Sequence, residues 1–285
     1  MKIAVIGGDK REEILIDYLA DIGYKISVLS NNQYDKKNIG SINNIKDCLY
    51  EADVVIAPMS STDKDGFLKA TFLEKKIKLD EAFFSQLKEG CIFLIGILKN
   101  EIKEIAESLS IEYIELAKLD NLAIMNAIPT AEGAIKIAIE ETDTTLYNSK
   151  ILVYGLGKVG YSLAWRLKAL GAQTYAVTRD KGAIARGKDI GIKMIKYDQL
   201  QHFLPKMNII FNTVPAKIID YKSLLLLNKK SVIIDLASAP GGIDFKSADK
   251  MGIKTILALG LPGKVAPRTA GKILADIIPD LIGEV

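Results

Sequence analysis

Short apolar runs rich in valine and isoleucine recur along the chain, separated by segments whose apolar residues repeat with the period of a helix. Strands that are apolar throughout are typical of a parallel sheet covered by helices on both faces. The pattern therefore predicts an α/β fold built from doubly wound parallel sheets. Strands are expected at residues 3–6, 25–29, 53–57, 91–95, 151–154, 173–177, 208–211, 231–236 and 254–257.

The strand and helix pattern begins twice, which predicts two domains. Residues 11–21 and 159–170 each place apolar side chains on one helical face, and each run ends at a glycine, as helices often do. A length of 285 residues fits two domains. We expect an N-terminal α/β domain (1–129), an interdomain helix and linker (130–149) and a second α/β domain (150–265). A C-terminal helix within 266–285 should pack back on the first domain, since the second sheet is already complete.

Three glycines in the segment 155–160 follow an apolar strand and open an amphipathic helix, which is the context of the dinucleotide-binding fingerprint. Gly155 permits the tight turn, Gly157 lets the backbone approach a pyrophosphate, and Gly160 allows close packing of the helix on the strand. The alternative is an α/β turn that merely uses glycine. The motif favours a Rossmann-like domain whose cofactor contacts include Gly155, Leu156, Gly157, Lys158, Val159 and Gly160.

The end of the next predicted strand bears on which nucleotide is bound. NAD sites place a carboxylate there for the ribose 2′-hydroxyl, whereas a cation accommodates the 2′-phosphate of NADP. Thr178 and Arg179 occupy this place, and the Arg179 guanidinium suits phosphate. Asp180 comes one residue later and should point elsewhere. The sequence favours NADP; the alternative is that Arg179 is a solvated loop charge and Asp180 binds NAD.

Ligands on open α/β sheets bind at the carboxyl ends of the strands, so further strand ends should complete the cofactor site. The alternative for these residues is ordinary polar capping of strands and loops. The candidate contacts are Asn212, Thr213, Val214, Pro215, Ala237, Ser238, Leu261 and Pro262.

The first half offers a different set of candidates. The loop from Gly7 to Arg11 lacks the third glycine of a dinucleotide site, but its amides, a helix N-terminus and two cations predict an anion site. The alternative is a solvated turn at Lys10 and Arg11, with Thr130 as an N-cap of the interdomain helix. The candidate substrate contacts in this half are Lys10, Arg11, Ser60, Ser61, Asn126 and Thr130.

Composition narrows the classes of function. The 38 basic and 35 acidic residues contain no long block of like charge, which argues against nucleic acid as a partner. The longest apolar runs predict no membrane partner, because a spanning helix needs roughly 20 residues. With two distant cysteines we expect no metal site, and with residues 1–8 patterned as a strand rather than a secretory signal we expect a cytoplasmic protein.

The chain contains one histidine, His202. Dehydrogenases of hydroxy acids usually hold a histidine as acid and base. His202 follows a strand of the second domain in a connection expected to lie away from the ligand, so we interpret it as structural. The sequence therefore favours a redox step that needs little acid–base help, and it identifies no catalytic residue.

These motifs resemble the A subunit of dipicolinate synthase from spore-forming bacteria. The resemblance covers nearly the whole chain and is most specific at residues 260–271. Ser61 stands where the family pattern has glycine. The other segments that carry the resemblance are 7–12, 126–134, 155–160, 211–215 and 234–242.

The resemblance implies an NADP-linked oxidation of dihydrodipicolinate, or of its hydroxytetrahydro precursor, to dipicolinate in the mother cell during sporulation. It also implies that the partner is a flavoprotein-like B subunit; a homo-oligomer stays open. Loss of hydride makes the ring aromatic, so no dedicated histidine base is required. A dicarboxylate needs cations on both sides, for which Lys264 and Arg268 are the candidates beside the loop at Lys10 and Arg11.

Two alternatives remain open. The chain could bind a nucleotide without performing chemistry, as a regulatory or scaffold subunit of a flavoprotein partner. A hydroxy-acid or shikimate-type dehydrogenase would share the architecture but needs a catalytic Lys–Asp or His–carboxylate pair, which the sequence does not place.

Overall fold

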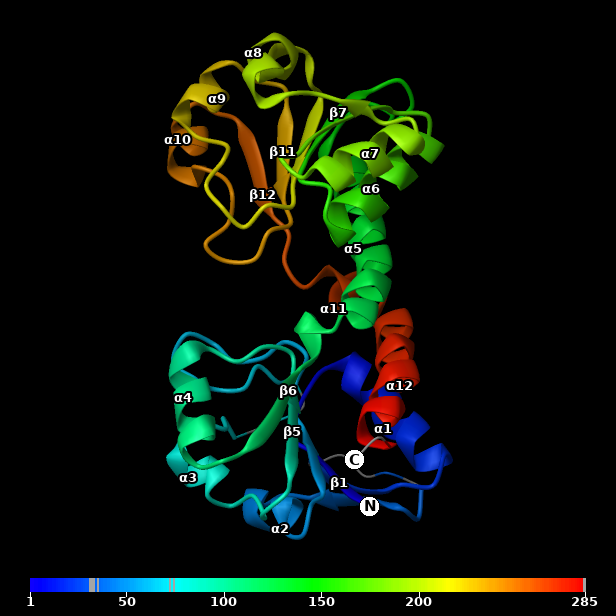
Figure 1. Ribbon diagram of the computed structural model, residues 1–285, viewed down its shortest axis with the longest axis vertical. Coiled ribbons are helices and arrows are strands. Elements are labelled where there is room, and N and C mark those ends of the chain that lie inside the picture. The colour runs from blue at the N-terminus through cyan, green and yellow to red at the C-terminus, as the bar shows by residue number, and fades with distance from the viewer. Residues whose placement is uncertain (31–33, 35, 72, 74, 284–285) are drawn as a thin grey trace. The chain divides into compact units, whose positions relative to one another are not determined.

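The protein is described by a computed structural model that covers residues 1–30, 34, 36–71, 73 and 75–283. The chain divides into two compact units, Met1–Met125 together with Ala266–Val285 (unit 1), and Asn126–Val265 (unit 2). Within the described residues, each unit holds one six-stranded parallel sheet flanked by helices (Figure 1). The predicted α/β fold of two doubly wound sheets is confirmed.

The sheet of unit 1 has the strand order β3-β2-β1-β4-β5-β6. The first crossover starts from the centre of the sheet, so the carboxyl ends of β1 and β4 lie side by side at the point where the strand order reverses. The edge strands β3 and β6 lie outside the predicted strands. The strands are β1 (Lys2–Val5), β2 (Lys25–Leu29), β3 (Ile39–Ile42), β4 (Val54–Ile56), β5 (Ile92–Ile95) and β6 (Glu112–Glu115), and the helices are α1 (Lys10–Asp21), α2 (Ile45–Leu49), α3 (Glu81–Phe84), α4 (Asn100–Ser108) and the short 3₁₀ turn η1 (Leu116–Lys118).

The sheet of unit 2 has the order β12-β11-β10-β7-β8-β9, with β7 and β10 at its centre. The edge strand β9 was not among the predicted strands. The strands are β7 (Lys150–Tyr154), β8 (Gln173–Val177), β9 (Lys193–Met194), β10 (Ile209–Asn212), β11 (Val232–Asp235) and β12 (Lys254–Leu257), and the helices are α6 (Lys158–Ala169), α7 (Lys181–Asp189), η2 (Tyr197–Gln199), α8 (Leu200–Phe203), η3 (Leu204–Lys206), α9 (Tyr221–Leu225), α10 (Phe245–Lys250) and α11 (Leu261–Val265).

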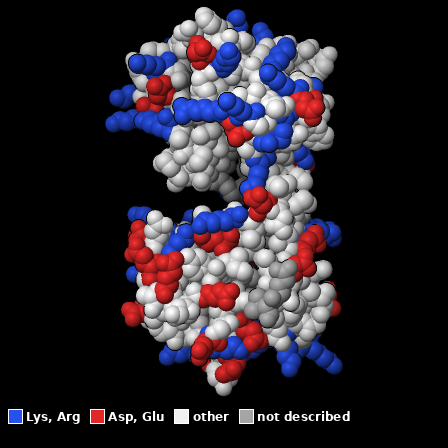
Figure 2. Space-filling view, viewed as in Figure 1, with Lys and Arg blue, Asp and Glu red and all other residues white. Residues whose placement is uncertain are grey.

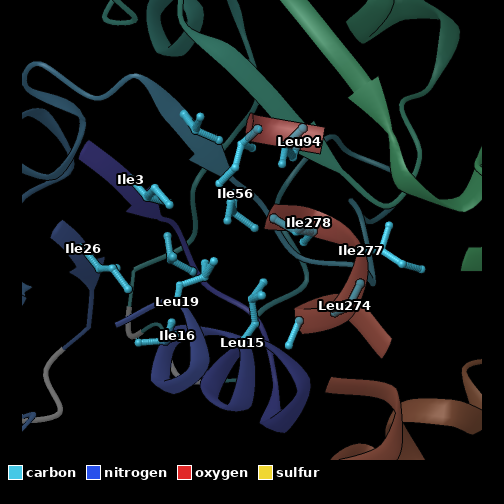
Figure 3. Packing of buried hydrophobic residues seen from close by; sticks show 14 of the residues in the cluster. Ile3, Leu15, Ile16, Leu19, Ile26, Ile56, Leu94, Leu274, Ile277 and Ile278 are labelled. Atoms are coloured by element: carbon cyan, nitrogen blue, oxygen red, sulfur yellow. The ribbon is translucent and has the colours of Figure 1, made fainter. Parts of the chain in front are cut away.

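The C-terminal helix α12 (Pro267–Gly283) packs against α1 on one face of the unit 1 sheet, as the sequence predicts. Its buried side chains, among them Leu274 and Ile278, meet Leu15 of α1 and Ile56 of β4 in one apolar cluster (Figure 3). A Cβ on Gly271 would lie 2.8 Å from the Arg11 carbonyl oxygen, so glycine permits the close approach of the two helices. The last segment of the chain thus completes the first core.

The interdomain helix, α5 (Asp120–Glu141), begins ten residues before the predicted start at Thr130. Pro129 lies inside it, and the Thr130 hydroxyl donates to the Asn126 carbonyl oxygen at 2.7 Å. The N-cap interpretation of Thr130 is therefore wrong, because the helix already begins at Asp120 and Thr130 lies inside it. Among the described residues α5 alone has the length and hydropathy of a membrane span, but 44% of that window is buried within the protein. Ala131, Ala134 and Ala138 pack in the core of unit 2, as in a core helix of a globular protein.

Candidate dinucleotide site

The glycine loop joins β7 to α6 in the geometry that the fingerprint predicts. Gly155 has a φ of +84°, a conformation that favours glycine. A Cβ on Gly160 would lie 2.1 Å from the Gly155 carbonyl oxygen, so this glycine brings the first turn of α6 against the loop. Leu156 is buried in the core of unit 2, and this packing holds the loop against the core.

Gly157 is the N-cap of α6, and its surroundings differ from those of the other two glycines. Its backbone makes no side-chain capping bond, and no heavy atom lies within 4 Å of the position of its absent Cβ. Gly157 therefore offers no capping side chain to α6, and helix N-termini of this kind bind anions. The position of the absent Cβ of Gly157 is open, as the fingerprint requires where a pyrophosphate approaches, and the helix dipole favours the negative charge of that group.

Asp180 and Arg179, the two candidate residues for binding the ribose end of the nucleotide, make different contacts after β8. The Asp180 carboxylate accepts a hydrogen bond from the Ala183 amide and is the N-cap of α7. The Asp180 amide in turn donates to the Thr178 hydroxyl at 3.3 Å. Arg179 is exposed, and its guanidinium lies 5.2 Å from the centre of the Tyr197 ring. Both residues are exposed, but the Asp180 carboxylate is engaged with its own helix, whereas the Arg179 guanidinium has the charge that suits a phosphate.

Asn212 lies fully buried at the end of β10, with its side chain engaged inside the protein. Its amide donates to the Asp235 carboxylate at 2.7 Å and to the Val214 carbonyl oxygen at 2.9 Å, and its own oxygen accepts from the Val214 amide. Asp235, at the end of β11, also accepts from the amides of Ala237 and Gly242. This buried pair fixes the two loops beyond β10 and β11. Sequence reasoning missed Asp235, although a lone aspartate ending an apolar strand was a usable signal.

The other predicted cofactor contacts at these strand ends differ in how far they are exposed to solvent. The Thr213 hydroxyl donates to the Tyr154 carbonyl oxygen at 2.8 Å and braces the glycine loop. Val214 is half-buried beside Gly155, since a Cβ on that glycine would lie 2.8 Å from it, whereas Pro215 and Ser238 are exposed and Ala237 is buried. Leu261 is buried in the unit 2 core, and Pro262 is half-buried on α11. Several of these residues therefore shape the loops through packing or hydrogen bonds.

The loop between β1 and α1 does not offer the free amides predicted for an anion site. The Asp9 carboxylate accepts from the Arg11 amide at 3.0 Å, and the Glu12 carboxylate accepts from the Asp9 amide at 2.8 Å, so a capping box occupies the helix N-terminus. Arg11 is buried, and its guanidinium binds Asp9 through two hydrogen bonds, at 2.9 and 2.8 Å. Acidic side chains hold the positions that an anion would take, and the predicted anion site at these amides is corrected accordingly.

Glu12 ties this loop to the neighbouring strand end. It is almost completely buried, and its second carboxylate oxygen accepts from the Met59 amide at 2.8 Å. Burial raises the pKa of Glu12, while Arg11 and the two amides oppose the rise. The carboxylate links the loops that follow β1 and β4.

Ser60 and Ser61 lie in the loop after β4, and their hydroxyls form hydrogen bonds with backbone groups of the protein. Ser60 donates to the Lys69 carbonyl oxygen at 2.6 Å, and the Ser61 hydroxyl accepts from the Ile97 amide at 2.8 Å. Ser61 is buried with a φ of +63°, in the left-handed region that favours glycine. This conformation is one in which the glycine expected from the resemblance would be unstrained.

The remaining candidates are more accessible. Lys10, Lys264 and Arg268 are exposed, and none of them pairs with an acidic side chain among the described residues. Asn126 is half-buried on α5, one turn before Thr130. His202 is exposed on α8 beside Gln201. Within the described residues no group of histidine, cysteine or acidic side chains has the arrangement of a metal site.

Charge is distributed unevenly between the units. Residues 126–265 hold 20 lysines and arginines against 11 acidic residues, a formal charge of +9, whereas the rest of the chain holds 18 against 24, or −6. On the face shown in Figure 2, blue side chains predominate over the unit that contains β7 to β12. A basic unit attracts an anionic dinucleotide at long range.

Comparisons with known proteins agree with this geometry. Residues 2–117 match the model of the N-terminal domain of the dipicolinate synthase A subunit. Residues 129–241 match the NAD binding domain of the D-isomer specific 2-hydroxyacid dehydrogenases, so the chain carries a nicotinamide-dinucleotide-binding domain of an oxidoreductase.

The chain is 36% identical to the dipicolinate synthase A subunit of Bacillus subtilis (strain 168), over 100% of this chain and 97% of that protein. The crystal structure of the dipicolinate synthase A subunit from Bacillus halodurans matches with a TM-score of 0.94 at 33% identity, covering 100% of this chain and 98% of the other. The crystal structure of the Bacillus subtilis protein matches with a TM-score of 0.91 at 36% identity, covering 100% and 96%. With relatives of this similarity along its whole length, the chain belongs to the family of dipicolinate synthase A subunits.

Proposed function

We propose that this protein oxidises dihydrodipicolinate, or its hydroxytetrahydro precursor, to dipicolinate by hydride transfer to NADP, in the cytoplasm of the sporulating mother cell. Family membership over the whole chain supports the reaction class. The observation that carries the redox role is the open space at Gly157, the glycine N-cap of α6 in the dinucleotide-binding loop. A flavoprotein-like B subunit is the proposed partner.

The proposed step requires little from acidic or basic side chains. Dihydrodipicolinate loses a hydride from a ring carbon and a proton to solvent, and the product ring is aromatic. The hydroxytetrahydro precursor would in addition lose one water molecule. Bound NADP would accept the hydride. Aromatisation supplies the driving force, so the work of the protein is to hold the ring against the nicotinamide and to exclude water.

The choice of NADP over NAD rests on the end of β8. Asp180 caps α7 and is engaged there, while the Arg179 guanidinium is exposed and able to bind a phosphate with two hydrogen bonds. Arg179→Ala should weaken NADP binding by about 1.5 to 3 kcal/mol, the range for hydrogen bonds to charged groups, and leave NAD binding nearly unchanged. Calorimetric titration with both nucleotides measures this, and equal losses or a native preference for NAD would contradict the assignment.

For the substrate carboxylates we propose Lys10, Lys264 and Arg268 as contacts, because they are exposed and without acidic partners among the described residues. Asn126 and Thr130 of α5 are proposed as polar contacts for orientation. The bidentate pair with Asp9 removes Arg11 from this set. Lys264→Ala should raise KM for dihydrodipicolinate and leave NADP affinity unchanged; loss of NADP affinity instead would reassign Lys264 to the cofactor.

The test of the whole proposal uses the purified chain with dihydrodipicolinate and NADP. NADPH should appear with the chain alone and faster once the B subunit is present. NADPH formation only with the partner present, together with nucleotide binding by this chain alone, would instead identify a nucleotide-binding scaffold protein. No reaction of either sample with dihydrodipicolinate but turnover of the hydroxytetrahydro compound would identify the hydrated precursor as the substrate.

A further inference from the structure

We propose that Tyr197 determines cofactor specificity as a positioning residue, by holding the Arg179 guanidinium where the 2′-phosphate of NADP binds. The inference rests on the proposed use of NADP and names a residue that the dinucleotide fingerprint does not contain. Tyr197 lies in η2, 18 residues beyond Arg179 along the chain.

The register of the sheet brings the two residues together. Strand β8 pairs in parallel with β9, with Tyr175 opposite Lys193 and Ala176 opposite Met194. The Ile195 amide continues this pairing by donating to the Ala176 carbonyl oxygen at 2.8 Å. Both pairs are offset by 18 residues, and the same offset carries Arg179 to Tyr197. The pairing of the short edge strand β9 with β8 therefore places Tyr197 beside Arg179 at the end of β8, where the ribose is expected.

The contact itself is a cation over an aromatic face. The Arg179 guanidinium carbon lies 5.2 Å from the centre of the Tyr197 ring, within the distance at which the ring attracts a cation. Tyr197 is half-buried and packs against the apolar cluster on its side of the sheet, which fixes the ring. Burial also raises the pKa of Tyr197, so the ring is neutral at pH 7. An exposed arginine on a loop is thereby restrained on one face while the rest of its guanidinium stays accessible.

The neighbouring residues complete the arrangement. Asp180 is engaged as the N-cap of α7, and the Thr178 hydroxyl accepts from the Asp180 amide, so hydrogen bonds on both sides of Arg179 hold this loop. A restrained guanidinium loses less conformational entropy when it binds a phosphate than a free one does. The ring should therefore improve NADP binding without touching the nucleotide.

The experiment measures dissociation constants of the full-length protein for NADPH, NADH and 2′,5′-ADP. Tyr197→Leu should weaken NADPH and 2′,5′-ADP by about two- to fivefold, the equivalent of a cation–π contact at an exposed site, and leave NADH unchanged. Tyr197→Phe keeps the ring and should bind all three like the wild type. Tyr221→Leu, at an exposed tyrosine of α9 in the same unit, is the matched control and should change none.

The outcomes separate this inference from the proposed function. If Arg179→Ala loses NADPH affinity while Tyr197→Leu does not, the role of Tyr197 is overturned and the use of NADP stands. If Arg179→Ala does not discriminate between the nucleotides, the use of NADP itself fails. The double variant should bind NADPH no more weakly than Arg179→Ala alone, and a fully additive loss would contradict the coupling. If Tyr197→Leu does not fold, Tyr197→Met provides the same measurement.

Discussion

Gly157 is the residue at which the dinucleotide site can be tested without disturbing the fold. Its φ of −72° suits any residue, and the position of its Cβ is open. Gly155 and Gly160 are different, because a side chain there would meet Thr213 or the Gly155 carbonyl oxygen at less than 3 Å. The same motif thus combines one glycine kept for a ligand with two kept for packing.

Gly157→Val should abolish nucleotide binding while the protein stays folded, because the branched side chain fills the space of the pyrophosphate. Nucleotide titration with a thermal melt checks both halves of the prediction. Gly160→Val should instead lower the melting temperature, since its Cβ meets backbone. A folded Gly157→Val variant that still binds NADP would show that the loop does not hold phosphate.

Ser61 combines a backbone conformation that costs free energy with a hydroxyl that recovers some of it. The left-handed φ disfavours any residue with a Cβ, while the hydroxyl satisfies the Ile97 amide. The Met59 carbonyl oxygen would lie 2.1 Å from a Cβ on Gly96, so the loops after β4 and β5 are closely packed here.

Ser61→Ala should destabilise the protein by about 1 to 3 kcal/mol, because it keeps the backbone cost and leaves the Ile97 amide without its partner. Ser61→Gly loses the same hydrogen bond but removes the backbone cost, so it should be less destabilising. Urea unfolding of the two variants gives the comparison. The reverse order would mean that the conformation at Ser61 carries no penalty.

At the scale of elements, the edge strand β6 is fastened to its neighbours through Glu115. This carboxylate is buried, accepts from the Leu98 amide at 2.9 Å and forms ion pairs with Lys103, at 3.0 Å, and Lys118. Burial raises the pKa of Glu115, but the hydrogen bonds from Lys118, Leu98 and Lys103 outweigh it, so the pKa lies below its usual value.

This shift makes stability dependent on pH in a defined direction. A carboxylate with a lowered pKa in the folded state contributes stability that is present above its unfolded pKa, near 4.5, and is lost as the pH falls through the folded value. Glu115→Gln should cost about 1 kcal/mol at pH 7 and lose less stability than the wild type on acidification. Urea unfolding at pH 7 and pH 4 tests this, and parallel losses in both proteins would refute it.

The three strands outside the sequence predictions, β3, β6 and β9, are all edge strands. Their sequences, such as Glu-Tyr-Ile-Glu in β6, are short and polar on at least one side. An edge strand has one neighbour and a solvent-exposed margin, so it needs no continuous apolar run. The apolar pattern therefore marks the central strands and β12, but not the edge strands β3, β6 and β9.

At the scale of the molecule, each unit has its own core, and the first core depends on the end of the chain. Ile273, Leu274, Ile278 and Ile282 of α12 are buried among side chains of α1 and the unit 1 sheet. Unit 2 is formed by one continuous segment of the chain, Asn126–Val265, which contains the whole glycine loop. Unit 1 alone thus requires residues from both ends of the sequence.

Deletion of Ala266–Val285 should unfold unit 1 and leave unit 2 folded, because only the first core loses apolar contacts. Burial of four large aliphatic side chains is worth several kcal/mol, roughly 1.5 to 3 each, which is comparable to the whole stability of a domain. Hydrogen exchange should show loss of protection confined to residues 1–125, with nucleotide binding retained. Protection throughout the truncated chain would mean that unit 1 does not need α12.

The sequence by itself determined the features that depend on local pattern. Apolar runs located the central strands and the edge strand β12, with β2, β8 and β12 at their predicted bounds, because strands of a helix-covered parallel sheet are rich in apolar residues. The glycine spacing at 155–160 located the predicted nucleotide loop, since each glycine is required by the local backbone conformation, by a close local contact or by the approach of the pyrophosphate. The packing of the last helix on unit 1 was also predictable, because the second sheet is complete before this amphipathic segment begins.

Only the tertiary structure decided which polar groups are available to a ligand. Arg11, Asn212 and the Ser60 and Ser61 hydroxyls are polar residues at strand ends, as a site requires, yet they bind Asp9, Asp235, Lys69 and Ile97 inside the protein. Tyr197 carries no signal in the sequence, and its place beside Arg179 comes from the register of β8 and β9. Residue type fixes what a side chain can bind, but its partner depends on the folded geometry: Arg11 turns back to Asp9 two residues away, whereas the partners of Asn212 and Ser61 lie 23 and 36 residues away.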